Sequence, residues 1–401
     1  MTTVDPPTDG SYEGGRLSRR AAATATTAAL ALALALALAL AACGSPGPAA
    51  KATGSHPAQA LPSDQPSTTH ASTTQDPSPT SVTSPPGTSP QAATTVPATP
   101  PASVSLARTA LAPPTTLTAF GGVQVAGEGA WRPAGRPVDG IPAVYETSLV
   151  PPGGTQAAGI AWMDTSLLSA RLYSGSLSPG GGPYEYTAAI QPAQAVSLVA
   201  AFNGGFQGAV GGGYYTQGRV VHPLVPGDAS LVIYADGNVT IGAWGRDVTM
   251  SRQVVGVRQN LVPLVAGGRP TAQASNPDWL AWGGTCGATS CSGPGIEHQW
   301  RSGAGVTADG ALLYVTGPSL DPLQLAELLV RAGAVRAMQL DINPDWTVLA
   351  TYRPSTPHGL ASPSNGSKLL ASTVQGPWTF FEPWWARDFI TMSARSAASH
   401  G

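Results

Sequence analysis

The stretch of sequence that decides the fold is DPLQLAELLVRAGAVRAMQLD, residues 321–341, because it is typical of a helix followed directly by a strand. Asp321 can cap the helix, Pro322 suits its first position, and Gln324 stands where a capping box has its second member. Apolar residues then recur at helical spacing, and Gly333 marks the end of the helix. The recurring apolar residues are Leu325, Leu328, Leu329 and Ala332.

Strands are predicted on both sides of this helix. Leu312–Thr316 precedes it, and Val335–Leu340 follows it as a buried strand that ends at Asp341. This order predicts one strand–helix–strand crossover. Further strands are predicted between turns rich in glycine and proline, at Val144–Val150, Ile160–Asp164, Ser169–Tyr173, Val196–Phe202, Ser230–Tyr234, Val239–Trp244 and Gly305–Ala308. The expected fold class is α+β, with mainly mixed or antiparallel β-sheets and a few helices.

The composition limits the classes of function. The chain has 401 residues, of which 42% are hydrophobic and only 10% charged, and its net charge is −2. This charge offers no electrostatic footprint for DNA or RNA, so no nucleic-acid partner is expected. The hydrophobic fraction is sufficient for a sizeable core.

The N-terminal segment predicts export. Residues 21–42 are uncharged and mostly Ala and Leu, and the pair Arg19-Arg20 before them resembles a twin-arginine signal. The run ends in Leu-Ala-Ala-Cys43, which resembles the lipobox of bacterial lipoproteins. We expect residues 1–43 to be a lipoprotein-type signal peptide, Cys43 to carry the lipid, and the protein to be anchored to the cell membrane on its extracytoplasmic side. The alternative is an uncleaved signal anchor with an inert cysteine.

Composition also divides the rest of the chain. Residues 44–115 consist mostly of Pro, Ser, Thr and Ala, which predicts a disordered stalk. Residues 116–395 contain all ten tryptophans and are expected to form one domain, and residues 396–401 a disordered tail. The tryptophans could stack on sugars, although buried core positions are the commoner outcome.

Two further cysteines lie close together. Cys286 and Cys291 are an even pair in an exported protein, which favours a local disulfide. The alternative is half of a zinc site, but there is no second cysteine pair, and His298 has no histidine neighbour. We therefore expect neither a metal nor a cofactor.

Two polar residues follow buried strands, where ligand sites often gather. Asp341 follows Val335–Leu340, and Asn203 follows Val196–Phe202 and precedes two glycines that allow a ligand close to the backbone. Both residue types are also common in turns, so either residue could be purely structural.

Several blocks of this sequence resemble, in the same order, those of a known family. The blocks are Ala201–Phe206, Gly256–Asn260 with Pro263–Val265, Arg301–Gly310, and Leu325–Leu328 through Gly333–Val335 to Leu340-Asp341. They are similar to blocks of the phosphodiester glycosidase domain, which removes a sugar from a sugar-1-phosphodiester and occurs in many bacterial exported proteins.

The resemblance implies roles for individual residues. Asn203 and the amides of Gly204 and Gly205 would contact the sugar or the phosphate. The Arg301 guanidinium suits a phosphodiester, and Asp341 would serve as acid, base or nucleophile. Together with Asn203, these two residues form the expected catalytic group, and we expect the three side chains to converge in one cleft. The second block contributes Asn260, which is expected to bind substrate.

The sequence departs from the family pattern after Asp341. The family has glycines and a serine there, whereas this chain has Ile342-Asn-Pro-Asp-Trp346, and a proline cannot take part in a glycine-rich phosphate cradle. Asp345 could bind substrate in place of the lost groups, or it could be a solvated turn residue. The expected function is a lipid-anchored glycosidase acting on a sugar phosphate of the cell envelope. The alternative is a surface lipoprotein that binds glycan without catalysis.

Overall fold

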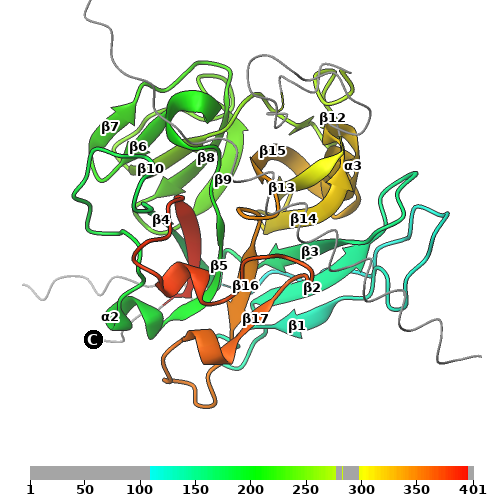
Figure 1. Ribbon diagram of the computed structural model, residues 1–401, viewed down its shortest axis with the longest axis horizontal. Helices are drawn as coiled ribbons and strands as arrows, with labels where there is room; N and C mark the ends of the chain where they lie inside the picture. The colour runs from blue at the N-terminus through cyan, green and yellow to red at the C-terminus, as the bar shows by residue number, and fades with distance from the viewer. Residues whose placement is uncertain (1–108, 277–281, 283–297, 396–401) are drawn as a thin grey trace, which may run out of the picture. The chain divides into compact units, whose positions relative to one another are not determined.

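The computed structural model describes residues 109–276, 282 and 298–395, all within one compact unit (Figure 1). The predicted signal peptide with Cys43, most of the predicted stalk, the cysteine pair 286 and 291, and the predicted tail lie outside the described residues. Within the described part of the chain, no helix is both long and apolar enough to cross a membrane.

Three antiparallel sheets form the unit. The eight-stranded sheet has the order β1 (Arg132–Ala134), β2 (Val144–Leu149), β3 (Ala158–Met163), β14 (Leu312–Leu320), β13 (Gln299–Thr307), β15 (Ala334–Ile342), β11 (Val265–Ala266) and β12 (Arg269–Pro270). One five-stranded sheet has the order β7 (Arg219–His222), β6 (Tyr214–Thr216), β10 (Val254–Gln259), β8 (Ala229–Tyr234) and β9 (Val239–Ala243). The other has the order β17 (Gly366–Lys368), β16 (Leu349–Tyr352), β5 (Leu198–Asn203), β18 (Phe389–Ala394) and β4 (Leu168–Tyr173).

Helices are few, as predicted. Those among the described residues are α2 (Pro192–Ala195), α3 (Pro322–Arg331) and the 3-10 turns Gly208–Gly211, Pro363–Asn365 and Thr379–Phe381. The α+β class is confirmed, and each strand predicted from the sequence overlaps an observed one, although β13 and β14 are several residues longer than predicted.

The predicted strand–helix–strand unit is confirmed at β14, α3 and β15 (Figure 1). β14 and β15 both pair antiparallel with β13, so they run parallel to each other on either side of it. The capping box forms as expected, since the Asp321 carboxylate accepts from Gln324 N at 2.6 Å and Gln324 Oε1 accepts from Asp321 N at 3.1 Å. Gly333 ends the helix with a positive φ of 101°.

The eight-stranded sheet separates two parts of the core. Successive residues of β14 alternate between them: Leu312 and Tyr314 pack on the face toward the five-stranded sheets, and Leu313 and Val315 on the other. α3 covers that other face through Leu325 and related apolar residues. We call these two sides of the sheet the inner face and the helix face.

The packed chain begins upstream of the predicted domain start at residue 116. Ala110 and Leu111 pack against core residues, and Leu111 N donates to Asp164 Oδ2 at 2.8 Å. Trp131 Nε1 also donates to Thr115 O at 2.9 Å. These contacts fix residues 110–115 to the unit.

Candidate active site

A β-bulge in β15 determines where Asp341 points. Arg301 of β13 pairs with Ile342 and Gly303 with Gln339, so a two-residue step on β13 faces a three-residue step on β15. The extra residue on β15 changes the alternation of side chains between the two faces. Gln339 lies on the helix face, whereas Leu340 packs on the inner face and the Asp341 carboxyl lies near Arg387 and Asp388.

Asn203 lies next to Asp341 but is saturated with hydrogen bonds. Its Oδ1 accepts from Tyr314 OH at 2.6 Å and Val348 N at 3.1 Å, and its Nδ2 donates to Gly204 O at 2.8 Å and Ser302 Oγ at 3.0 Å. Ser302 Oγ in turn donates to Asp341 O at 2.8 Å. Asn203 therefore orders the backbone that carries Asp341.

The Asp341 carboxyl is buried and only partly satisfied. Its side chain is 4% exposed, Oδ1 accepts from Ile342 N at 2.9 Å, and Oδ2 has no hydrogen-bond partner. Burial raises the pKa of Asp341 to about 7, although the charge of Arg387 opposes this rise. A carboxyl with this pKa can exchange a proton near neutral pH.

Arg387 lies beside Oδ2 of Asp341 and contacts Trp346, which in turn contacts Trp385. Arg387 Nε lies 3.6 Å from Asp341 Oδ2, and both Nε and Nη1 of Arg387 are buried without a hydrogen-bond partner. The guanidinium lies 4.4 Å from the ring centre of Trp346, which also contacts the ring of Trp385 at 5.5 Å. Trp385 Nε1 is a further buried donor without a partner. We call Asp341, Arg387, Trp346 and Trp385 the Asp341 cluster.

Such an accumulation of unpaired polar atoms is unusual, because buried polar groups are normally hydrogen-bonded. The cluster is close to the surface, since the Arg387 side chain is 13% exposed and Trp346 is half-buried. A ligand that enters beside Arg387 would therefore meet two arginine donors and one carboxyl oxygen.

A buried ion pair between Arg258 and Asp388 lies next to the Asp341 cluster. Arg258 Nε donates to Asp388 Oδ2 at 2.8 Å, Nη2 donates to Oδ1 at 3.3 Å, and both side chains are fully buried. The remaining donors of Arg258 bind the carbonyls of Gln259 and Phe206. Each nitrogen of this guanidinium therefore already has a protein partner.

Gly204 and Gly205, whose amides were expected to contact the substrate, pack tightly against this ion pair. A Cβ on Gly204 would lie 2.1 Å from Asp388 Oδ2, and a Cβ on Gly205 would lie 2.6 Å from Asn260 Oδ1. The Gly204 amide donates to Asp388 O at 2.8 Å. In the structure, these glycines thus allow a close approach of protein groups to the backbone.

Asn260 connects two segments near the bulge. Its Nδ2 donates to Gln339 O at 3.0 Å and Leu340 O at 2.9 Å, and its Oδ1 accepts from Phe206 N at 3.0 Å. Asn260 therefore holds β15 at the bulge against the turn after β5.

Arg301 does not join Asn203 and Asp341. Its guanidinium lies on the helix face, where Nε donates to Leu320 O at 2.7 Å and Nη1 donates to Gln339 Oε1 at 2.8 Å and Trp282 O at 3.1 Å. Burial lowers the pKa of Arg301 to about 10. Of the three side chains expected to converge, Asn203 is linked through Ser302 to the backbone of Asp341, and Arg301 lies across the sheet.

The turn after β15 contains the departure from the family pattern. Asn343 adopts a positive φ of 87°, a conformation that glycine adopts most easily and asparagine tolerates better than most residues. Its carbonyl accepts from Trp346 N and Thr347 N, both at 3.2 Å. Asp345 is exposed on this turn, and its amide donates to Asn343 Oδ1 at 2.8 Å. The turn thus keeps one backbone position typical of glycine, at Asn343, and places Trp346 against Arg387.

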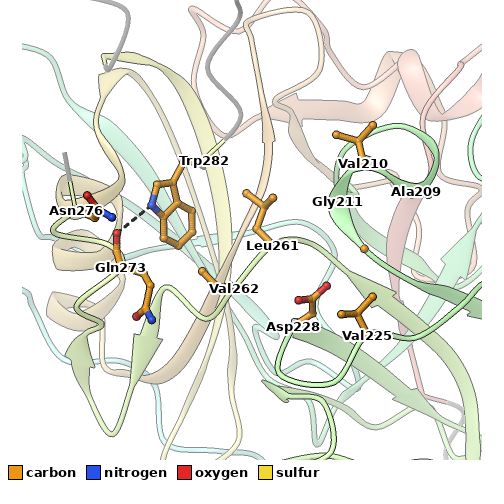
Figure 2. Close-up of a pocket in the computed structure, with 11 residues that line it drawn as sticks. Ala209, Val210, Gly211, Val225, Asp228, Leu261, Val262, Gln273, Asn276 and Trp282 are labelled. Atoms are coloured by element: carbon orange, nitrogen blue, oxygen red, sulfur yellow. Dashed lines mark hydrogen bonds between the residues drawn. The ribbon is translucent and has the colours of Figure 1, made fainter. Parts of the chain in front are cut away.

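A separate open pocket of about 450 Å³ lies near Asn260 and is lined by neither Asp341 nor Arg387 (Figure 2). Figure 2 shows Trp282 and Gln273 on one side, Val225 and Asp228 on the other, and Leu261 between them. Burial raises the pKa of Asp228. No group of three or more His, Cys, Asp or Glu side chains among the described residues could hold a metal ion.

Sequence reasoning missed Arg387, Asp388 and the role of Arg258. Arg258 stands within a recognised block, but nothing in the pattern distinguishes a structural arginine from one that binds ligand. Arg387 and Asp388 follow a segment rich in tryptophan and carry no motif. An aspartate directly before the apolar pair Phe389-Ile390 was the one available signal.

The comparisons agree with the resemblance noted in the sequence. Residues 197–342 match the family model of the phosphodiester glycosidases. This part of the chain is similar to that family, which supports a glycosidase-like hydrolase function. No curated protein matches the chain.

Two solved structures are similar to the chain at low identity. One is the zebrafish N-acetylglucosamine-1-phosphodiester alpha-N-acetylglucosaminidase catalytic domain, auto-inhibited by its pro-peptide, at 14% identity and a TM-score of 0.40, covering 65% of this chain and 87% of that one. The other is a protein from Synechocystis at 12% identity and a TM-score of 0.35, covering 66% and 64% respectively.

Proposed function

We propose that this protein is an exported, lipid-anchored enzyme that hydrolyses the bond between a sugar and phosphate in a glycan of the cell envelope. The observation that carries the proposal is the buried Oδ2 of Asp341, which has no hydrogen-bond partner and lies 3.6 Å from Arg387 Nε. The family match of residues 197–342 supports the reaction class.

Asp341 acts as the general acid. Its pKa of about 7 leaves a substantial fraction protonated near neutral pH, and it is close to that of a departing phosphate monoester. As the C1–O bond breaks, Asp341 gives its proton to the bridging oxygen, and the phosphate leaves with the electron pair. Water adds to C1, and its released proton restores Asp341.

Turnover by the full-length protein tests this proposal. The substrates are UDP-N-acetylglucosamine and an aryl N-acetylglucosamine-1-phosphodiester, and the readout is released sugar. We expect kcat/KM to fall as the pH rises above about 7, because the acid is then ionised. Asp341→Asn should lose at least about a hundredfold in kcat, the lower end for removal of a general acid.

Asp139→Asn is the matched control. Asp139 is exposed in a turn with a positive φ of 49°, which asparagine tolerates, so this variant should keep wild-type turnover. Equal turnover in Asp341→Asn and the wild type would refute the role of Asp341.

A non-catalytic glycan-binding protein is the second candidate. It is favoured by the saturated hydrogen bonds of Asn203 and by the non-glycine turn after Asp341. Binding of envelope glycan without release of sugar from any sugar-1-phosphodiester in a panel would support this candidate and exclude the enzyme.

Membrane anchoring through Cys43 belongs to the same proposal, supported by the apolar run that ends at this residue. Metabolic labelling with a radioactive fatty acid should mark the wild-type protein and leave Cys43→Ala unlabelled. Equal labelling of both would show that Cys43 is not the lipidation site.

A further inference from the structure

We infer that Arg387, backed by the ring of Trp346, binds the phosphoryl group of the substrate beside Asp341. This inference rests on the proposed function, which by itself leaves the phosphate-binding residue open. The family resemblance implies Arg301 for this role, so the inference assigns the phosphate to a different arginine.

The hydrogen bonds of Arg258, Arg301 and Arg387 favour this choice. The donors of Arg258 are directed to Asp388 and two backbone carbonyls. Arg301 donates to Leu320 O, Trp282 O and Gln339 Oε1 on the helix face. Arg387 Nε and Nη1, in contrast, are buried without a hydrogen-bond partner, and Nε has only the ion pair with Asp341 at 3.6 Å.

Trp346 gives Arg387 a fixed position. The guanidinium carbon lies 4.4 Å from the centre of the indole ring, within the range of a cation–π contact. The ring therefore limits the side-chain rotamers of Arg387 and occupies one face of the guanidinium. The donors in the guanidinium plane stay available for a phosphate.

The carboxyl of Asp341 makes this arrangement dependent on protonation. When Asp341 is ionised, its charge repels an anion that approaches Arg387. When it is protonated, the repulsion ends and Oδ2 can donate to a phosphoryl oxygen. The other ionisable groups near the carboxyl are Arg258, Asp388 and Tyr314.

Binding of dimethyl phosphate to the full-length protein tests the inference separately from turnover. This diester stays a monoanion over the working pH range, and the neutral trimethyl phosphate controls for contacts that do not depend on charge. Affinity is measured at pH 5.5 and pH 8.5 by ligand-observed NMR. The variants are Arg387→Met, Asp341→Asn and Arg171→Met.

Arg387→Met should weaken binding of dimethyl phosphate by about tenfold or more, because two charge-assisted donors are lost. Asp341→Asn should bind severalfold more tightly than the wild type at pH 8.5 and show little change with pH. Arg171→Met should bind as the wild type does, since Arg171 stacks 4.0 Å from the Tyr186 ring but has an exposed side chain outside the cluster.

The outcomes separate the inference from the proposed function. Unchanged binding in a folded Arg387→Met variant overturns the inference, even if Asp341→Asn loses turnover. Loss of binding in that variant supports the inference, even if no sugar phosphodiester is hydrolysed. Arg387→Lys keeps the charge but not the planar fork, and its partial recovery of affinity would show that Arg387→Met acts through the lost cation.

Discussion

Hydrogen-bond saturation distinguishes reactive from structural side chains at the scale of single residues. The side-chain nitrogen and oxygen atoms of Asn203 and Arg258 have hydrogen-bond partners, and each residue holds neighbouring backbone in place. Asp341 is buried as well and Arg387 lies nearer the surface, but both keep atoms without a hydrogen-bond partner. Buried polar atoms without hydrogen-bond partners destabilise the folded state, and they are typical of residues retained for binding or catalysis.

The pH dependence of stability tests the cost of burying Asp341. The pKa is raised from 3.8 to about 7 on folding, so between these values the folded state holds a proton that the unfolded state has lost. The contribution of Asp341 to the free energy of unfolding therefore falls as pH rises from about 4 to 7. Asp341→Asn should remove this loss.

Denaturant unfolding at several pH values measures the effect. Relative to the wild type, Asp341→Asn should gain about 2–4 kcal/mol in stability between pH 4 and pH 8. The pKa of Glu146 is also raised to about 7, but its contribution is common to both proteins and cancels in the comparison. A constant difference across this range would contradict the raised pKa of Asp341.

The tight packing at Gly204 gives a second prediction for a single residue. Gly204→Ala would place a methyl group 2.1 Å from Asp388 Oδ2 and force the ion pair with Arg258 to shift. We expect a loss of roughly 1–3 kcal/mol or more in thermal or denaturant unfolding, as for overpacked sites.

Gly256→Ala is the control for added side-chain volume, because the nearest atoms to its Cβ would lie at an ordinary 3.5 Å. This variant should stay within about 1 kcal/mol of the wild type. Equal stability of Gly204→Ala and Gly256→Ala would show that the backbone at Gly204 can relax.

At the scale of elements, β13 and β15 act as one unit whose two faces have different roles. Arg301 and Gln339 bind each other on the helix face, and Ser302 and Asp341 lie together on the inner side. Arg301 also reaches Leu320 O, directly before the cap of α3. The helix and the candidate site are therefore connected through the same pair of strands.

The cap of α3 gives a prediction at this scale. Asp321→Ala removes the acceptor for Gln324 N and should lower the free energy of unfolding by about 1 kcal/mol. Asp321→Asn keeps an oxygen acceptor and should recover most of the loss. Unchanged stability of Asp321→Ala in urea unfolding would indicate that packing of the apolar helix face alone fixes the helix start.

At the scale of the whole molecule, prediction from sequence succeeded where local signals agree. The capping box, the helical spacing and the glycine stop predicted α3, and turns rich in glycine and proline separated the predicted strands, among them β8 and β9. These features depend on residues near each other in the chain. The family resemblance added the order of the blocks.

The missed features depend on contacts between distant segments. β18 joins β4 and β5, about two hundred residues earlier in the chain, and Asp388 meets Arg258 across 130 residues. The bulge that directs Asp341 depends on the register between β13 and β15, which residue types alone do not specify. Arg387 could not be found from the family blocks because it lies beyond residue 342.

The position of β18 predicts a strict requirement for the C-terminal region. β18 is an interior strand between β5 and β4, so a chain ending at Glu382 would lose the centre of that sheet and Asp388. We expect this chain to lack a cooperative thermal transition. A chain ending at Arg395 keeps β18 and should unfold like the full protein, and a cooperative transition in the shorter chain would contradict the topology.

The bulge in β15 has a consequence for how sequences with this sheet can diverge. Ser302 of β13 faces both Leu340 and Asp341 of β15, so the extra residue decides where the Asp341 carboxyl lies. Deleting Leu340 would restore regular pairing and move Asp341 into the position of Leu340, which packs in the core of the inner face. A single-codon deletion could thus abolish chemistry while the sheet remains, giving descendants that keep the architecture for other uses.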